Sequence, residues 1–344
     1  MGLVGIGALS IYSSSIARND FSNFEKQLLF LGIGFFGILL VSFFDYRLLR
    51  NDPYLILFFY FIGLLALAGL YLFAPEIRGI KGWYRIGDIS IDPIEYIKFV
   101  LIIIMAKYFA LRHIEVYRIR HIVLTGIYFF IPILLIAFQP NLGPIFILAI
   151  LWIVLLLVTG IRFRHLFTLI FVGILVCTLV WSVFLLDYQK SRIVSFFEPE
   201  LDPLGIGWSQ LQSRIAIGSG GMFGQGFGQG TQTQYGFLSE PQTDFIFAAI
   251  AEEFGLFGVS LIFLLLLLLV WRVVKIGIAA QDNFSRLYAT GLATLLIAQT
   301  FINVGMNLGL LPIVGLSLPF VSYGGSSLIA TYIGLGVLLS IKTH

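Results

Sequence analysis

Apolar segments long enough to cross a lipid bilayer recur along the whole of this 344-residue chain. Hydrophobic residues make up 59% of the sequence and charged residues only 11%, a composition that ordinary soluble domains do not have. Inside a bilayer every backbone polar group must be satisfied by the protein, so such segments fold as helices. The sequence therefore predicts an all-α polytopic membrane protein, with one integral-membrane domain over residues 1–344.

We expect about ten transmembrane helices. The first is short and has no basic residue before it, which leaves open a start further upstream. Between the seventh and the eighth lies a large polar segment, 187–243, which we expect to be partly re-entrant. The predicted spans are 1–16, 27–44, 54–73, 94–111, 122–138, 143–160, 166–186, 245–270, 287–306 and 325–341.

Basic residues gather on one side of these spans. Twelve Lys and Arg, against four Asp and Glu, lie in loops 45–52, 107–121, 161–165 and 272–286 and in the tail after 341. The other side holds nine Lys and Arg against twelve Asp and Glu. Because cytoplasmic loops carry the positive excess, both termini are predicted to be cytoplasmic, with loops 75–96 and 187–243 outside. Basic residues next to a membrane suit anionic headgroups, so the net charge of +3 does not indicate nucleic-acid binding.

Asp244 is the carboxylate that most strongly indicates function. It stands where the polar segment gives way to the apolar run 245–270, and an ionisable group at the mouth of a span is costly to keep. The alternative is structural: Ser239 and Gln242 fit a capping box, and an acid in the first helical turn is favoured by the helix dipole.

A second group of charged residues precedes the fourth predicted span. Asp92, Pro93 and Glu95 are typical of a helix N-terminus, with Asp92 as the N-cap. Glu95 and Lys98 are three residues apart and share one face of that helix. The two form either a local ion pair or a site in which Glu95 orients Lys98 toward a phosphate at headgroup depth.

Other polar and aromatic residues on the outer side allow two interpretations each. Trp83 is either an aromatic residue of the membrane interface or part of a binding cavity. Arg214, beside Gln212, is either a phosphate or sugar contact or an arginine that snorkels to the interface. Gln139 and Asn141 lie in a tight connection between two spans, which either serves only as the turn that a helical hairpin needs or also brings their amide groups to the outer surface.

Seven glycines lie between positions 218 and 230. A nucleotide-binding glycine loop needs a preceding strand and a βαβ unit, which this chain does not offer. We expect instead close backbone packing of a re-entrant segment that lines a protein-walled cavity. Glu252 and Glu253, deeper in the following span, are expected to be structural and to bond to neighbouring helices or to a basic partner.

Several motifs follow one another in the order found in one known family. They are 212–221, 230–232, 237–240, 243–247, 252–253 and 318–327. Together they resemble the SEDS family of bacterial cell-wall proteins, which act in shape, elongation, division and sporulation. Motifs 230–232, 139–140 and 312–315 look more like the elongation member, RodA, than the division member, FtsW. The chain departs from the family pattern at Asp92, Asn141, Trp208 and Ser239.

The resemblance implies a peptidoglycan glycosyltransferase of the bacterial plasma membrane. It would polymerise lipid II on the outer side and work with a class B penicillin-binding protein as the crosslinking transpeptidase. Asp244 would be the general base that activates the 4-hydroxyl of the acceptor sugar, and undecaprenyl pyrophosphate would leave in an inverting displacement.

The residues of the predicted outer side could independently supply the contacts that such a substrate needs. Lys98, oriented by Glu95, and Arg214 beside Gln212 would neutralise the pyrophosphate, while Trp83 would help to form the sugar cavity. A divalent cation, Mg²⁺ or Mn²⁺, is left open as a cofactor, because no cluster of metal ligands in the sequence demands one. The four histidines and the single cysteine show no metal-site spacing.

Two other functions remain open from the sequence. A lipid II flippase would use the same cavity as a translocation path, although the polar residues gather on one side and alternating access needs a site at the midplane. A non-catalytic scaffold would only recruit the transpeptidase. For the partner we expect docking on the outer rims of spans 245–270 and 287–306, where Ala289, Gly291 and Ala293 would allow close helix approach. The alternative is that these three residues pack inside the protein.

Overall fold

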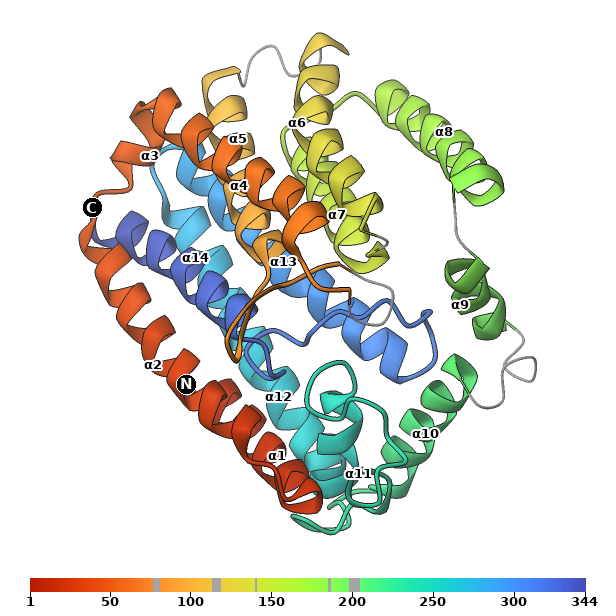
Figure 1. Ribbon diagram of the computed structural model, residues 1–344. Coiled ribbons are helices and arrows are strands. Elements are labelled where there is room, and N and C mark those ends of the chain that lie inside the picture. Colours follow the sequence, from red (N-terminus) through yellow and green to blue (C-terminus); the bar gives the residue numbers. More distant parts are fainter. Residues whose placement is uncertain (77–80, 113–118, 140, 185–186, 198–204) are drawn as a thin grey trace.

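The computed structural model describes residues 1–76, 81–112, 119–139, 141–184, 187–197 and 205–344, and these are almost entirely helical (Figure 1). The elements in chain order are α1 (Gly2–Arg18), α2 (Ser22–Phe43), α3 (Arg47–Asn51), α4 (Pro53–Phe73), β1 (Tyr84–Ile86), β2 (Ile89–Ile91), α5 (Pro93–Arg112), α6 (Ile119–Ala137), α7 (Leu142–Val158), α8 (Phe163–Leu179), the π-turn η1 (Val180–Phe184), α9 (Asp187–Phe197), α10 (Ile206–Ser219), α11 (Thr231–Gln234), α12 (Ile246–Ala279), α13 (Asn283–Asn307) and α14 (Gly325–Thr343).

Each predicted span corresponds to a separate helix. Seven of these helical segments are long and apolar enough to cross a membrane, namely α2, α4, α6, α8 with η1, α12, α13 and α14. Helices α1 and α7 have 17 residues each, and α5 carries charged side chains at both ends. The chain is a multi-pass, all-helical membrane protein, as predicted.

The two segments predicted to lie outside the membrane contain regular structure that their sequence did not indicate. Strands β1 and β2 form a small antiparallel hairpin in which Tyr84 pairs with Ile91. The long polar segment contains helices α9 and α10. Helix α10 can form because its interior, residues 208–217, contains neither glycine nor proline.

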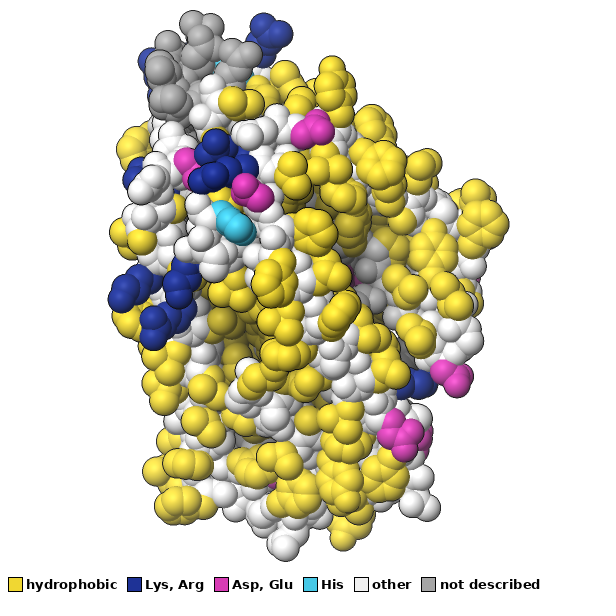
Figure 2. Space-filling model, turned by 90° about the vertical axis from the view of Figure 1, so that its left-hand side faces the viewer, with side chains coloured by type: hydrophobic (Ala, Val, Ile, Leu, Met, Phe, Trp, Pro, Cys, Tyr) yellow, Lys and Arg dark blue, Asp and Glu magenta, His cyan; other side chains and the backbone are white. Residues whose placement is uncertain are grey.

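Helix α13 lies at the centre of the bundle and contacts α5, α7 and α12, while α14 packs along α2 (Figure 1). The hydroxyl of the fully buried Tyr288 donates to the carbonyl of Gly334 at 2.8 Å and so ties α13 to α14. Helix α8 stands apart from the others (Figure 1). The side of the molecule shown in Figure 2 is mostly hydrophobic, with Lys and Arg gathered toward one end, as expected for a protein surrounded by lipid.

The small residues of α13 face inward, so the expectation that they receive a partner helix is wrong. Ala289 and Ala293 are 1% and 5% exposed. A Cβ added at Gly291 would lie 2.6 Å from Cγ2 of Ile102 on α5, and one added at Gly277 of α12 would lie 2.7 Å from Cβ of Ala289. These positions are small because α5 and α12 approach α13 closely.

The glycine run packs backbone to backbone against α12, as expected. A Cβ added at Gly220 would lie 1.9 Å from the carbonyl oxygen of Ala251, and one at Gly224 would lie 2.1 Å from that of Glu253. Helix α12 is kinked at Gly255, whose φ is 62°. The loop satisfies the backbone there, since the N–H of Leu256 donates to the carbonyl of Gly221 at 2.9 Å.

Candidate functional site

Asp244 lies in the turn that leads into α12. The helix begins at Ile246, with Phe245 as its N-cap, and has neither a side-chain cap nor an acidic residue in its first turn. The alternative interpretation of Asp244 as a first-turn acid behind a capping box of Ser239 and Gln242 is therefore wrong. Asp244 is a half-buried residue of the preceding turn.

Two asparagines of α13 hold the backbone of Asp244. Nδ2 of Asn303 donates to the carbonyl oxygen of Asp244 at 3.1 Å, and Nδ2 of Asn307 donates to the same oxygen at 2.9 Å. Both asparagines are fully buried, and because they are four residues apart they share one face of the helix. Two donors on one carbonyl fix the backbone that carries the carboxylate.

The segment between α13 and α14 holds the same turn from another direction. Oγ of Ser322 donates to the carbonyl of Thr243 at 2.7 Å and accepts from the N–H of Leu318 at 2.8 Å. A Cβ added at Gly315 would lie 3.7 Å from Oδ2 of Asp244. The carboxylate of Asp244 therefore lies beside this segment.

Helix α10 belongs to the same hydrogen-bond network. Oγ of Ser213 donates to the carbonyl of Asn307 at 2.8 Å, and Oδ1 of Asn307 accepts from the N–H of Ala248 at 3.2 Å. Asn307 thus connects α10, the first turn of α12 and the backbone of Asp244. The motifs around residues 213 and 244, separate in sequence, meet at this one side chain.

The two predicted substrate contacts of α10 lie on opposite sides of that helix. Gln212 is 6% exposed and faces the protein interior, as does its neighbour Ser213. Arg214 is exposed, and its Cδ would lie 3.0 Å from a Cβ added at Gly309, in the turn after α13. Arg214 is therefore the member of the pair that a ligand can reach.

The predicted cap and ion pair at the start of α5 are both present. Oδ1 of Asp92 accepts from the N–H of Ile94 at 2.8 Å, and Nζ of Lys98 lies 2.7 Å from Oε2 of Glu95. Burial and the nearby Glu95 carboxylate raise the pKa of Asp92 to about 7, although the Ile94 N–H and Lys98 act in the opposite direction. The charge of this cluster therefore changes near neutral pH.

Segment 315–327 connects this cluster to the turn that carries Asp244. Oγ of Ser326 accepts from the N–H of Asp92 at 2.9 Å and donates to the carbonyl of Ser90 at 3.4 Å. The same segment places Gly315 beside the Asp244 carboxylate. One short stretch of chain therefore borders both groups of charged residues.

A largely apolar groove of about 840 Å³ lies between α2, α4, α5 and α14. Its polar lining at one end includes Asp92, Glu95 and Ser326, and at the other end it reaches Tyr46 and Ser340. Lys98 is fully buried and does not line the groove, so a ligand in the groove would meet Glu95 and Asp92 first.

The β hairpin closes the polar end of the groove. Ile89, Ser90 and Ile91 of the hairpin line it, and the hydroxyl of Tyr84 anchors the hairpin to α4 by donating to the carbonyl of Ala66 at 2.7 Å. Trp83 is half-buried directly before β1 and does not line the groove. The structure therefore places Trp83 next to the site and not within the groove itself.

Gln139 is buried, so the alternative that its amide reaches the outer surface is wrong. It is 1% exposed, and its Nε2 donates to the carbonyl of Leu67 at 2.8 Å, which joins the α6–α7 connection to α4. Asn141 is half-buried. The neighbouring Pro140, residues 79–80 of the smaller outer loop and the acidic stretch 198–203 lie outside the described residues.

Glu252 and Glu253 anchor the glycine run. Glu252 accepts from the N–H groups of Gln232 and Thr233 at 2.7 and 3.0 Å. Glu253 accepts from Oγ of Ser13 and, at 3.1 Å, from Nε2 of Gln234. The partners within the described chain are polar groups of α1 and α11, so of the two expected kinds of partner the structure shows neighbouring helices and not a basic side chain.

The described residues contain no group of three or more His, Cys, Asp or Glu side chains that could hold a metal ion. Mg²⁺, however, is commonly bound by only one or two carboxylates together with substrate phosphates. Asp92 and Glu95, both at the polar end of the groove, are a pair of that kind.

Comparison with known proteins identifies the family. The model of the cell cycle proteins FtsW, RodA and SpoVE matches residues 1–344. The chain belongs to this family. The SEDS resemblance seen in the sequence is thereby confirmed over the whole chain.

Individual relatives of the FtsW/RodA/SpoVE family agree with this assignment. Peptidoglycan glycosyltransferase MrdB of Escherichia coli K12 is 34% identical, over all of this chain and 91% of its own length. Stage V sporulation protein E of Bacillus subtilis 168 is 35% identical, over 99% of this chain and 94% of its own. The predicted enzyme class, a peptidoglycan glycosyltransferase, is confirmed.

A solved structure of the family has the same fold. A chain of a peptidoglycan synthase complex that coordinates polymerization and crosslinking superposes with a TM-score of 0.84 at 32% identity. The match covers 99% of this chain and 96% of that one. The overall arrangement of helices is thus the one found in that structure.

Proposed function

We propose that this peptidoglycan glycosyltransferase polymerises lipid II, with Asp244 as the general base. The observation that carries the proposal is the position of segment 315–327, which borders Asp244 at one end and the Asp92–Glu95 cluster at the mouth of the groove at the other. A lipid-linked sugar needs an apolar groove for its tail, a polar site for its pyrophosphate and a base beside its sugar. These three features are adjacent here.

The reaction is an inverting displacement. Asp244 takes the proton from the 4-hydroxyl of the acceptor N-acetylglucosamine, and that oxygen forms a bond to the anomeric carbon of the donor N-acetylmuramic acid. The bond from this carbon to the pyrophosphate breaks, and its electron pair leaves with undecaprenyl pyrophosphate. The fixed backbone of Asp244 favours such a role, because a base must be held within hydrogen-bond reach of its proton.

Lys98 stabilises the charge that develops on the leaving pyrophosphate. Its ammonium is fully buried, so its positive charge acts on the pyrophosphate across the protein interior and not by direct contact. Its ion pair with Glu95 also means that the mouth of the groove does not carry two unpaired carboxylates. Arg214, exposed on α10, contacts pyrophosphate or sugar, with Gln212 behind it. Trp83 contributes an aromatic wall on the sugar side.

Asp92 and Glu95 are the residues that would hold a divalent cation with the pyrophosphate. Mg²⁺ or Mn²⁺ would supply charge neutralisation there when bound. The ion is supported by the pairing of these two carboxylates at the end of the groove, where an unaccompanied pyrophosphate would be repelled.

The proposed topology is one integral-membrane domain with ten spans and both termini in the cytoplasm. Helices α1, α5 and α7, added to the seven long apolar spans, make ten. The active site faces outward, because Lys and Arg are in excess on the other side of the membrane. The glycine run with α11 is then the re-entrant part of the outer segment, since it reaches Glu252 and Glu253 within α12.

The proposed partner is a class B penicillin-binding protein that crosslinks the new strands. The match to a chain of a synthase complex that couples polymerization to crosslinking supports this. A role in elongation is supported by the RodA-like motifs and by the relative MrdB, while the sporulation relative is just as similar at 35% identity.

A flippase for lipid II is the second candidate. The groove runs along α2 and α14 from the Asp92–Glu95 cluster at one end to Tyr46 at the other, as a translocation path would. Purified protein in liposomes with fluorescent lipid II separates the candidates. We expect glycan polymer. Transfer of lipid II between leaflets without polymer would instead establish the flippase, and the absence of both would leave a scaffold.

A further inference from the structure

A second pocket, with charged residues in its lining, lies where the end of α5 farther from Asp92 meets the end of α13 farther from Asn307. Its volume is about 510 Å³, and it is walled by α3, the start of α4, the end of α5 and the start of α13. Its charged lining residues are Arg50, Lys107 and Asp282. By the distribution of Lys and Arg this is the cytoplasmic side, so the pocket has no part in the proposed reaction.

Lys107 is the residue that indicates a ligand. It is only 9% exposed, and its Nζ has no hydrogen-bond partner among the described residues. A buried ammonium without a partner is costly, and such a group is retained where something else compensates it. Since Lys107 lines the pocket, the compensating group belongs in the pocket.

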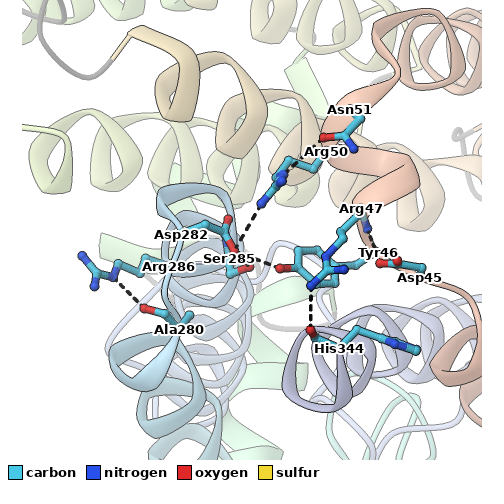
Figure 3. Close-up of polar contacts among 10 residues, drawn as sticks. All are labelled: Asp45, Tyr46, Arg47, Arg50, Asn51, Ala280, Asp282, Ser285, Arg286 and His344. Atoms are coloured by element: carbon cyan, nitrogen blue, oxygen red, sulfur yellow. Dashed lines mark hydrogen bonds and ion pairs between the residues drawn. The ribbon is translucent and has the colours of Figure 1, made fainter.

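Arg50 provides a second cation at the rim. Its Nε donates to Oδ1 of Asn51 at 3.3 Å, and its nearest carboxylate oxygen, Oδ2 of Asp282, is 3.9 Å from Nη1 (Figure 3). Asp282 is already bonded to the N–H and hydroxyl of Ser285 at 3.0 and 2.8 Å and to the hydroxyl of Tyr46 at 3.0 Å. Most N–H donors of Arg50 are therefore available to an anion.

The pocket also includes the N-terminus of a long helix. Asn283 and Phe284, the first residues of the 25-residue α13, line it, and backbone N–H groups at a helix start attract anions. The carboxylates of Asp52 and Asp282 cap α4 and α13, and Asp52 also attracts the Lys107 ammonium electrostatically without a hydrogen bond to it. Two cations, the side-chain amides of Asn51 and Asn283 and a helix N-terminus together match a phosphate.

We propose that this pocket binds a phosphate group, with Lys107 and Arg50 as its charged contacts. The source that the surroundings favour is the headgroup of an anionic phospholipid, because Ala110 and the 71% exposed Leu111 continue the wall of the pocket onto the apolar surface. Soluble phosphate shares the same chemistry and would enter from the cytoplasm.

The test measures thermal unfolding of the purified protein in nanodiscs of phosphatidylcholine alone and of phosphatidylcholine mixed with phosphatidylglycerol. A bound headgroup stabilises the folded state, so we expect a higher Tm in the mixed discs. Lys107→Met and Arg50→Gln should each lose most of this difference and weaken phosphatidylglycerol binding about tenfold, as measured by the lipid retained in native mass spectrometry. Lys342→Gln, on the same side but outside the pocket, should keep it.

Inorganic phosphate added to the phosphatidylcholine discs distinguishes the source. A rise in Tm that depends on Lys107 with phosphate, and not with phosphatidylglycerol, would support the site with a soluble ligand. The proposal is overturned if neither probe raises Tm, or if the rise is the same in wild type, Lys107→Met and Arg50→Gln. If Lys107→Met does not fold, the Tm difference of the Arg50→Gln variant decides the question, because Arg50 lies at the rim with 38% of its side chain exposed.

Discussion

Asp92 sets the charge at the mouth of the groove. Its pKa is raised to about 7, chiefly by burial and by Glu95, so the side chain is protonated below neutral pH and ionised above it. The added carboxylate repels a pyrophosphate, and about 1 kcal/mol of repulsion corresponds to roughly a fivefold loss of affinity. We therefore predict that, with divalent cations removed by EDTA, KM for lipid II rises about fivefold between pH 6 and pH 8.

The matched variant for this prediction is Asp92→Asn, which keeps an N-cap but cannot ionise. Its KM should stay at the low-pH value over the whole range, while kcat follows the same pH profile as in wild type. A KM that rises equally in the variant would assign the pH dependence to another group.

Single-residue features were predictable where the interaction is local in sequence. The cap at Asp92 and the Glu95–Lys98 pair follow from spacing along one helix. Asn303 and Asn307 were missed, because their partner Asp244 is 59 and 63 residues away. Two amides four residues apart in an apolar span were nevertheless a signal, since polar groups inside a membrane need a bonded partner.

At the scale of elements, the packing of the glycine run against the kink of α12 can be tested most directly. Gly224 has a φ of +82°, and a Cβ there would lie 2.1 Å from the carbonyl oxygen of Glu253. We predict that Gly224→Ala lowers the free energy of unfolding by about 2 kcal/mol or more, from strained backbone and steric overlap together. Thermal unfolding in detergent measures the loss.

Gly218→Ala is the control for this variant, because a Cβ at Gly218 meets no atom within 4 Å. Its Tm should match or exceed that of wild type, since alanine favours helix at the end of α10. Equal stability of both variants would mean that the glycine run does not pack on α12 as described.

The elements that the sequence could predict are those with a strong hydrophobic signal. Runs of about 20 apolar residues identify spans regardless of neighbours. Helix α10 and the β hairpin lack such a signal: α10 is a mixture of polar and apolar residues, and the hairpin is held by contacts to α4 and α14. Elements stabilised by tertiary contacts cannot be read from local pattern alone.

At the scale of the whole molecule, we predict that a partner helix docks on the exposed apolar surface of α13. The small residues face inward, whereas Ile297 and Phe301, one turn apart in the half of α13 that contacts Asp244, are 53% and 69% exposed. Large side chains at the centre of an interface carry most of its energy. We predict that Phe301→Ala lowers co-purification with the transpeptidase about fivefold or more and leaves Tm unchanged.

Phe130→Ala on α6 removes an equally large ring that is 58% exposed and distant from α13 in sequence. It should leave co-purification at the wild-type level. If both substitutions weaken the complex to the same extent, the effect is one of general surface change and α13 is not the docking face.

Asp244→Asn tests the central claim most directly, with polymerisation of fluorescent lipid II by the purified protein as the measurement. The substitution keeps the shape of the side chain and the backbone contacts to Asn303 and Asn307 but removes the base. We predict that the rate falls about 100-fold or more while Tm and lipid II binding persist, and that Asp88→Asn, in the exposed hairpin turn, stays active. Polymer formed by Asp244→Asn at the wild-type rate would contradict the account.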